Sequence, residues 1–162
     1  MTDKYVNAEV AADKLTSGLF TGKGAETTTV METVAVLAAD ADGDVYRIFE
    51  NVPSSLVPVK IEIHNTAVTG GTDYDIGLYE PKGGAVVDKD ILADGISMAT
   101  ARTVATSNNA GMTTIAIASG VKTLGELSAQ TAVDASYDIA LTANTVGTAD
   151  GTIKVTATFA YK

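Results

Sequence analysis

The sequence predicts an all-β protein, an antiparallel β-sandwich with a jelly-roll-like topology. Three observations point to this class. Small and β-branched residues (Ala, Thr, Val and Gly) dominate the composition, and long helix-forming residues are few. Seven or eight segments have the apolar patterning of strands. Gly-rich turns separate these segments at the spacing typical of sandwiches.

The first strand is expected over residues 26–37, which are apolar enough on both sides to lie within a sandwich. Asp40–Asp44 (Asp-Ala-Asp-Gly-Asp) follows it, and residues 45–51 form the next predicted strand. Because an Asp-Gly pair between two strand patterns favours a tight turn, we expect a hairpin here. The same aspartates fit the first three ligand positions of an EF-hand loop, so a calcium site is the alternative interpretation. Val45 replaces the required Gly, and Asn51 replaces the required Glu.

Residues 52–58 contain two prolines and are expected to form a loop outside any central ladder. The strand that follows is predicted to be half-buried. Its inward side chains would be Val59, Ile61 and Ile63. Its outward side chains would be Lys60, Glu62 and His64.

Residues 73–79 predict another strand, with Tyr74, Ile76 and Leu78 on one face. A Pro-Lys-Gly-Gly turn at 81–84 ends it. The next segment carries clustered carboxylates, namely Asp88, Asp90 and Asp94. A glycosidase would need such groups across a cleft lined with aromatic side chains, and the chain has no Trp. We therefore expect Asp88 and Asp90 to cap turns or the start of a short helix.

Residues 98–112 have weak periodicity and predict a long connection, and a strand is expected over 113–119. The one short helix is predicted near 122–130. Thr123 is its expected N-cap, and Glu126 completes a capping box.

The chain is predicted to end in a hairpin of residues 137–142 and 152–161, joined through Gly147 and Gly151. The six tyrosines are expected to be core and sheet residues, with Tyr79 and Tyr161 as exposed contact residues in the alternative interpretation.

Residues 1–24 have little apolar surface and mild helical character over 1–15, so we expect an extended N-terminal arm that is not folded by itself. It is either a segment that orders on contact with a partner or a frayed terminus. Residues 25–162 would then form a single β-sandwich domain.

The net charge is −9, and it lies mostly in the first half: residues 1–81 hold thirteen acidic and five basic residues. Nucleic acid is therefore not an expected partner, because binding phosphates requires a basic surface. An acidic surface suits docking onto a basic partner, or it is simply solvated. No apolar run approaches the roughly 20 residues of a membrane helix, so no membrane partner is expected either. No signal peptide is recognised.

The chain has no Cys and one His, which excludes disulfides, thiolate chemistry and Cys/His zinc sites. His64 lacks a serine or carboxylate context and is expected to be a surface group. The glycines at 18, 22 and 24 do not form a phosphate-binding loop. We therefore expect no enzyme activity, no catalytic residues, no cofactor and no resident metal ion.

Several segments, taken in order, are similar to small virion proteins of tailed bacteriophages, the capsid decoration (cement) proteins. In the first half these are Asp-Val-Tyr-Arg-Ile-Phe (44–49), Val-Pro-Ser (52–54) and Pro-Val-Lys-Ile-Glu-Ile (58–63). Asp-Tyr-Asp-Ile-Gly-Leu-Tyr (73–79) and Gly-Gly-Ala-Val-Val-Asp-Lys-Asp (83–90) follow. Tyr-Asp-Ile-Ala-Leu-Thr (137–142) and Gly-Thr-Ile-Lys-Val-Thr (151–156) complete the set.

The resemblance covers roughly Gly18 to the C-terminus. It implies a jelly-roll-like sandwich that is made in the host cytoplasm and binds the outside of the phage capsid. There it would bridge major capsid protein subunits, as a homotrimer in preference to a homodimer. Two alternatives stay open: another virion role, in the tail or in head completion, and a carbohydrate- or receptor-binding module.

Overall fold

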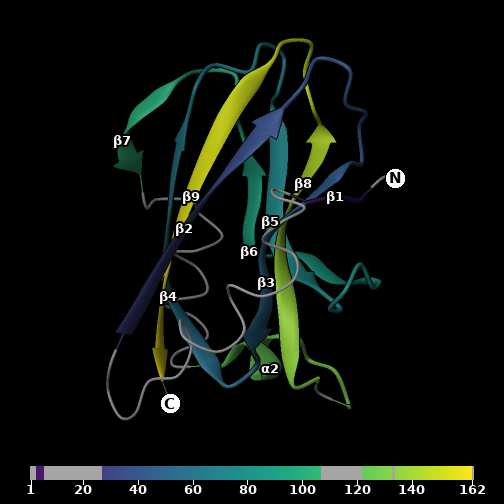
Figure 1. Ribbon diagram of the computed structural model, residues 1–162, viewed down its shortest axis with the longest axis vertical. Coiled ribbons are helices and arrows are strands. Elements are labelled where there is room, and N and C mark those ends of the chain that lie inside the picture. Colours follow the sequence, from purple (N-terminus) through teal and green to yellow (C-terminus); the bar gives the residue numbers. More distant parts are fainter. Residues whose placement is uncertain (1–2, 6–26, 107–121, 133, 162) are drawn as a thin grey trace.

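A computed structural model describes residues 3–5, 27–106, 122–132 and 134–161, and it is a sandwich of two β-sheets (Figure 1). Its elements are β1 (Asp3–Tyr5), β2 (Thr27–Val36), β3 (Val45–Pro53), β4 (Leu56–Asn65), β5 (Asp73–Tyr79), β6 (Val86–Ile96), β7 (Arg102–Thr106), α2 (Leu124–Leu127), β8 (Ser136–Thr145) and β9 (Gly151–Tyr161). One sheet has the strand order β1-β3-β8-β5-β6, and the other has the order β2-β9-β4-β7.

The strand order confirms the jelly-roll prediction. If β2 to β9 are counted as first to eighth, one sheet runs first, eighth, third, sixth and the other second, seventh, fourth, fifth. This is the order of two Greek keys wrapped into a double-sheet jelly roll. The pairs among these eight strands are antiparallel. β1 is the exception, since it pairs with β3 in parallel.

The core lies between the two sheets. It is formed by the side chains that the alternating sequence pattern of the strands predicted to point inward. Tyr74, Ile76 and Leu78 of β5 are fully buried there. They meet Val34 of β2 and Phe159 of β9 in one continuous cluster. Burying some thirty apolar side chains in this way is the main force that holds the sheets together.

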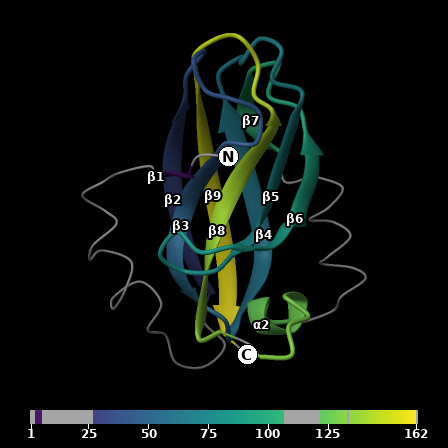
Figure 2. The ribbon, with the colours of Figure 1, turned by 90° about the vertical axis from the view of Figure 1, so that its right-hand side faces the viewer.

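Two predicted hairpins are wrong, because their strands lie in opposite sheets. β2 and β3 flank the Asp40–Asp44 turn, yet β2 pairs with β9 and β3 pairs with β8. Similarly, β8 and β9 are consecutive strands but belong to different sheets. These turns therefore cross the end of the sandwich, opposite α2 (Figures 1 and 2). Among the described strands, β5 and β6 form the consecutive pair that shares a sheet.

β2 faces the core on one side only, whereas the sequence predicted an environment buried on both sides. Val30, Val34 and Val36 are buried, and the alternate residues are exposed. Met31 on the outer face is 55% exposed.

The expected loop at 52–58 is also wrong. Most of it is strand, and only Ser54 and Ser55 turn between β3 and β4. Pro58 pairs with Phe159, and the register then shifts so that Lys60 pairs with Thr158. The shift leaves Val59 as the extra residue, which explains why this side chain is 45% exposed instead of inward. Ile61 and Ile63 point inward as predicted.

The capping box of the helix is confirmed. The Thr123 hydroxyl accepts a hydrogen bond from the Glu126 N–H, and the Glu126 carboxylate accepts one from the Thr123 N–H. The helix is shorter than predicted, spanning Leu124–Leu127. The expected connection at 98–112 contains β7, and the strand expected at 113–119 lies outside the described residues.

Asp3–Tyr5, which belongs to the predicted arm, is extended and pairs with β3, so the mild helical character of 1–15 does not produce a helix at these three residues. The remainder of the predicted arm lies outside the described residues, so the division into an arm (1–24) and a domain (25–162) stays a prediction. The described residues include no helix with the length and apolar character needed to cross a membrane.

Candidate functional site

A wide bulge in β6 shapes the outer face of the sheet that contains β5. Leu78 pairs with Asp88 and Ile76 pairs with Ala93, so four residues of β6 lie opposite Gly77 alone. The bulged backbone passes directly over Gly77. A Cβ atom at this position would lie 2.1 Å from the carbonyl oxygen of Asp88. Glycine is therefore required here so that the two backbones can approach each other.

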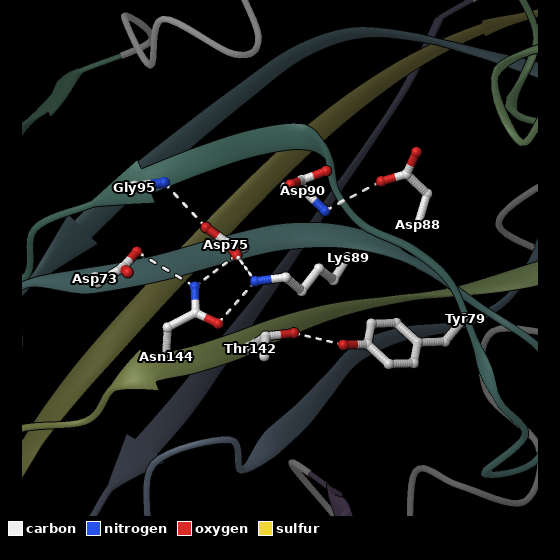
Figure 3. A network of polar contacts seen from close by, with 9 residues as sticks. All are labelled: Asp73, Asp75, Tyr79, Asp88, Lys89, Asp90, Gly95, Thr142 and Asn144. Carbon is white, nitrogen blue, oxygen red and sulfur yellow. Dashed lines mark hydrogen bonds and ion pairs between the residues drawn. The ribbon is translucent and has the colours of Figure 1, made fainter.

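The bulge brings Lys89 over β5 and β8, where it joins a polar network (Figure 3). Its Nζ lies 2.9 Å from Oδ2 of Asp75 and 2.9 Å from Oδ1 of Asn144. Asn144 Nδ2 donates to the same Asp75 oxygen at 2.6 Å, and the Gly95 N–H donates to the other at 3.0 Å. Asp75 is 1% exposed. Its two carboxylate oxygens accept hydrogen bonds from Lys89, Asn144 and Gly95, as a buried carboxylate requires.

The pKa values of these groups follow from their surroundings. Burial tends to raise the pKa of Asp75, but the hydrogen bonds from Gly95, Lys89 and Asn144 outweigh it and hold the pKa below its usual value. The hydrogen bond to Asp75 raises the pKa of Lys89. The negative charge of Asp75 raises the pKa of Asp94. At neutral pH the network therefore holds an ion pair between the buried Asp75 carboxylate and the Lys89 ammonium, whose side chain is 46% exposed.

The carboxylates of Asp75, Asp90 and Asp94 lie within 4.8 Å of one another, as in a metal site. The Lys89 ammonium, however, occupies the position next to Asp75 that a cation would take. The Asp88 carboxylate accepts a hydrogen bond from the Asp90 N–H two residues on at 3.4 Å, so Asp88 caps a local turn within β6, as predicted. Asp90 lies in the β6 bulge, and neither residue starts a helix. The arrangement ties the bulge to β5 and β8, and the described residues that form it include no Ser, Cys or His.

A second buried polar cluster fixes the turn between β5 and β6. Arg47 and Asp138 form an ion pair at 3.0 Å, and both side chains are 0% exposed. Arg47 also donates to the carbonyl oxygens of Glu80 at 2.8 Å and Gly84 at 2.7 Å. Its guanidinium lies 4.9 Å from the centre of the Tyr79 ring. Arg47 thus holds both ends of the Pro-Lys-Gly-Gly turn against β3 and β8.

Burial raises the pKa of Asp138, although Arg47 and the Asn51 N–H act in the opposite direction. The alternative interpretation of Tyr79 as an exposed contact residue is wrong, since this side chain is 1% exposed. Tyr46, Tyr74 and Tyr137 are buried as predicted, and Tyr161 is half-buried.

The Asp40–Asp44 segment uses its carboxylates as acceptors for backbone N–H groups. Asp40 accepts from the Leu37 N–H, Asp42 from the Val146 N–H and Asp44 from the Ala41 N–H. These bonds are those of a turn that is tied to the neighbouring β8–β9 connection. The geometry favours the turn over the calcium loop.

His64 is half-buried on the outer face of β4, on the polar side that the sequence predicted. The glycines at 18, 22 and 24 lie outside the described residues. Sequence reasoning missed the Arg47–Asp138 and Lys89–Asp75 pairs. The available signal was a charged residue in the middle of an otherwise apolar strand, as with Arg47 and Asp138.

The pH dependence of stability tests the role of Asp75. We expect Asp75→Asn to destabilise the fold at pH 7 by about 1–3 kcal/mol, because Lys89 loses its charged acceptor. The pKa of Asp75 is lower in the folded state than the ordinary value of 3.8. Its contribution is therefore complete above that value and is lost as the pH falls through the lower, folded pKa. Urea unfolding of both proteins from pH 7 to pH 2.5 should show the difference shrinking below about pH 4. A constant difference would contradict this role.

The chain is thus a jelly-roll sandwich. On the outer face of one sheet, the Arg47–Asp138 and Lys89–Asp75 ion pairs hold the β5–β6 turn and the β6 bulge in place. No family model matches the chain, and no curated protein matches its sequence. Among solved structures, it is similar to a chain of "Capsid of Ralstonia phage GP4", with a TM-score of 0.58 and 13% identity. That match covers 100% of this chain and 97% of the other. A chain of "Cyanophage Pam1 capsid asymmetric unit" is also similar, with a TM-score of 0.45, 16% identity and coverage of 94% and 96%. The first of these similarities establishes a shared fold.

Proposed function

We propose that this protein is a structural component of a bacteriophage virion, and specifically a decoration protein that binds the outside of the head. The observation that carries the proposal is the fold shared with a chain of a phage capsid, which extends over 100% of this chain and 97% of that one. A fold hosts many functions, so this likeness supports the proposal together with the residues described above.

The two polar clusters, around Asp75 and around Asp138, support a role in binding rather than in catalysis. Asp75 and Asp138 are the kind of buried carboxylates that enzymes use, but each is held by a cationic side chain and by backbone N–H groups. Such pairs stiffen the outer face of the sheet instead of presenting a reactive group. A rigid scaffold with preformed contact surfaces loses little conformational entropy when it binds.

The charge of the chain supports attachment to a shell. A net charge of −9 keeps free molecules apart until a complementary surface is available. As proposed, the partner is the major capsid protein, and the protein bridges neighbouring subunits at local symmetry axes. A homotrimer suits such an axis, because several modest contacts then add up to strong binding.

Co-sedimentation tests this function. Purified protein is added in increasing amounts to phage heads isolated without it, and the heads are then pelleted. We expect the bound protein to saturate at a fixed ratio to the major capsid protein. The amount bound should fall as salt is added, because the contact is partly electrostatic. Binding to tails but not to heads would favour a different virion role, and binding to neither would refute the proposal.

A further inference from the structure

The described strands leave four sheet edges, and three of them are protected against pairing with another strand. β1 has three residues and β7 has five. β6 is long, but it carries charged residues and is interrupted by bulges. Short length, charges and bulges are the features by which β-proteins prevent edge-to-edge association.

β2 is the edge with the least of this protection, since a single inward charge, Glu32, is its one such feature. Its ten residues, Thr27–Val36, pair with β9 at every position without a register shift. It contains no Lys, Arg or Pro, and Glu32 is its single charged residue. In an antiparallel pair, alternate residues direct their N–H and C=O groups away from the partner. Within the described part of the chain, β2 therefore presents a long, regular edge that fits an additional strand.

Glu32 indicates what kind of strand fits. It belongs to the inward row of β2, between Val30 at 4% and Val34 at 1% exposure, and it is half-buried. No described residue forms a hydrogen bond or an ion pair with it. A strand added beside β2 would cover this carboxylate further. Covering an unpaired charge is costly, whereas covering it with a cation opposite is favourable.

The same residue argues against a second copy of β2 as the added strand. In an antiparallel β2–β2 pair, Glu32 would face either another Glu32 or an uncharged residue, because β2 has no cation. Like charges directly opposite each other destabilise a sheet.

We propose that the β2 edge is where the protein, acting as a capsid-binding protein as proposed above, receives an extended segment of the shell protein by β-strand addition. The segment is uncharged apart from a Lys or Arg that lies opposite Glu32. Backbone hydrogen bonds along β2 supply the affinity, and the pair with Glu32 fixes the register.

Two labelled peptides test the edge without any shell. One is Thr-Val-Thr-Lys-Thr-Val-Thr, and the other has Glu in place of the central Lys. We expect the full-length protein to bind the Lys peptide about three- to tenfold more tightly, and Glu32→Lys to reverse this preference. Asp134→Lys makes the same change in net charge at an exposed loop position and should keep the wild-type preference. Equal binding of both peptides, or the same effect from both variants, would overturn the proposal.

Hydrogen exchange of the wild-type protein provides a second measurement that does not depend on the folding of a variant. Within residues 27–36, the amides that point away from β9 should gain at least tenfold protection when the protein binds phage heads. If the heads are not bound at all, the proposed function fails, and the peptides still decide whether the edge accepts a strand. Protection of these outward amides already in the free monomer would mean that the chain itself covers this edge. Protection that rises with protein concentration would mean that a second copy does, and either result would overturn the proposal.

Discussion

Arg47→Met is expected to destabilise the protein by about 3–5 kcal/mol. The substitution leaves the Asp138 carboxylate buried without its cation, which costs far more than the net value of the pair. It also removes the donors to the carbonyl oxygens of Glu80 and Gly84, so the turn between β5 and β6 loses its attachment. Equilibrium unfolding in urea at pH 7 measures the change.

The mechanism of this loss can be checked in two ways. Because burial already raises the pKa of Asp138, the variant should recover part of its stability as the pH falls and the carboxyl is protonated. The matched control is Lys60→Met, which removes the cation of the exposed pair with Glu62. That change should stay within about 1 kcal/mol. If the Arg47 and Lys60 variants are equally stable, the buried pair does not hold the fold as described.

Gly77→Ala is expected to cost about 3 kcal/mol. The added Cβ would lie 2.1 Å from the Asp88 carbonyl oxygen and 2.2 Å from the Lys89 carbonyl carbon. Both are backbone atoms, so no change of rotamer can relieve the contact, and the β6 bulge must move. The displacement would separate Lys89 from Asp75 and Asn144 (Figure 3).

Gly95→Ala is the control for this substitution. Gly95 has a φ of +65°, but no atom lies within 4 Å of its missing Cβ. Its replacement should therefore cost only the backbone strain, about 1 kcal/mol. Thermal unfolding measures both variants, and amide exchange of residues 88–93 reports whether the bulge has moved. A Gly77 variant no less stable than the Gly95 variant would mean that the bulge does not need glycine.

The sequence indicated the local structure well where one residue row packs against the core. Alternation located β5 and β8, and the capping box located α2 because its partners are three residues apart. It did not indicate which strands pair. In a jelly roll most consecutive strands lie in opposite sheets, so the pairing depends on contacts between distant segments that local patterns do not record.

The polar clusters were missed for a related reason. Arg47 and Asp138 are 91 positions apart, and only the three-dimensional register brings them together. In β6, four residues lie opposite one, which destroys the alternation from which a strand is recognised. The sequence therefore predicted turns or a short helix at Asp88 and Asp90; the Asp88 carboxylate does accept from the Asp90 N–H, but within a strand. The buried carboxylate that ties the bulge to β5 and β8 is Asp75, through Lys89, Asn144 and Gly95.

Electron cryo-microscopy of phage heads, incubated with saturating protein and compared with untreated heads, tests the central claim most directly. The account predicts added density outside the shell at local symmetry axes, with the shape of this two-sheet sandwich and contacts to the major capsid protein. Heads that remain bare at saturating protein, with no added density at any axis, would contradict it.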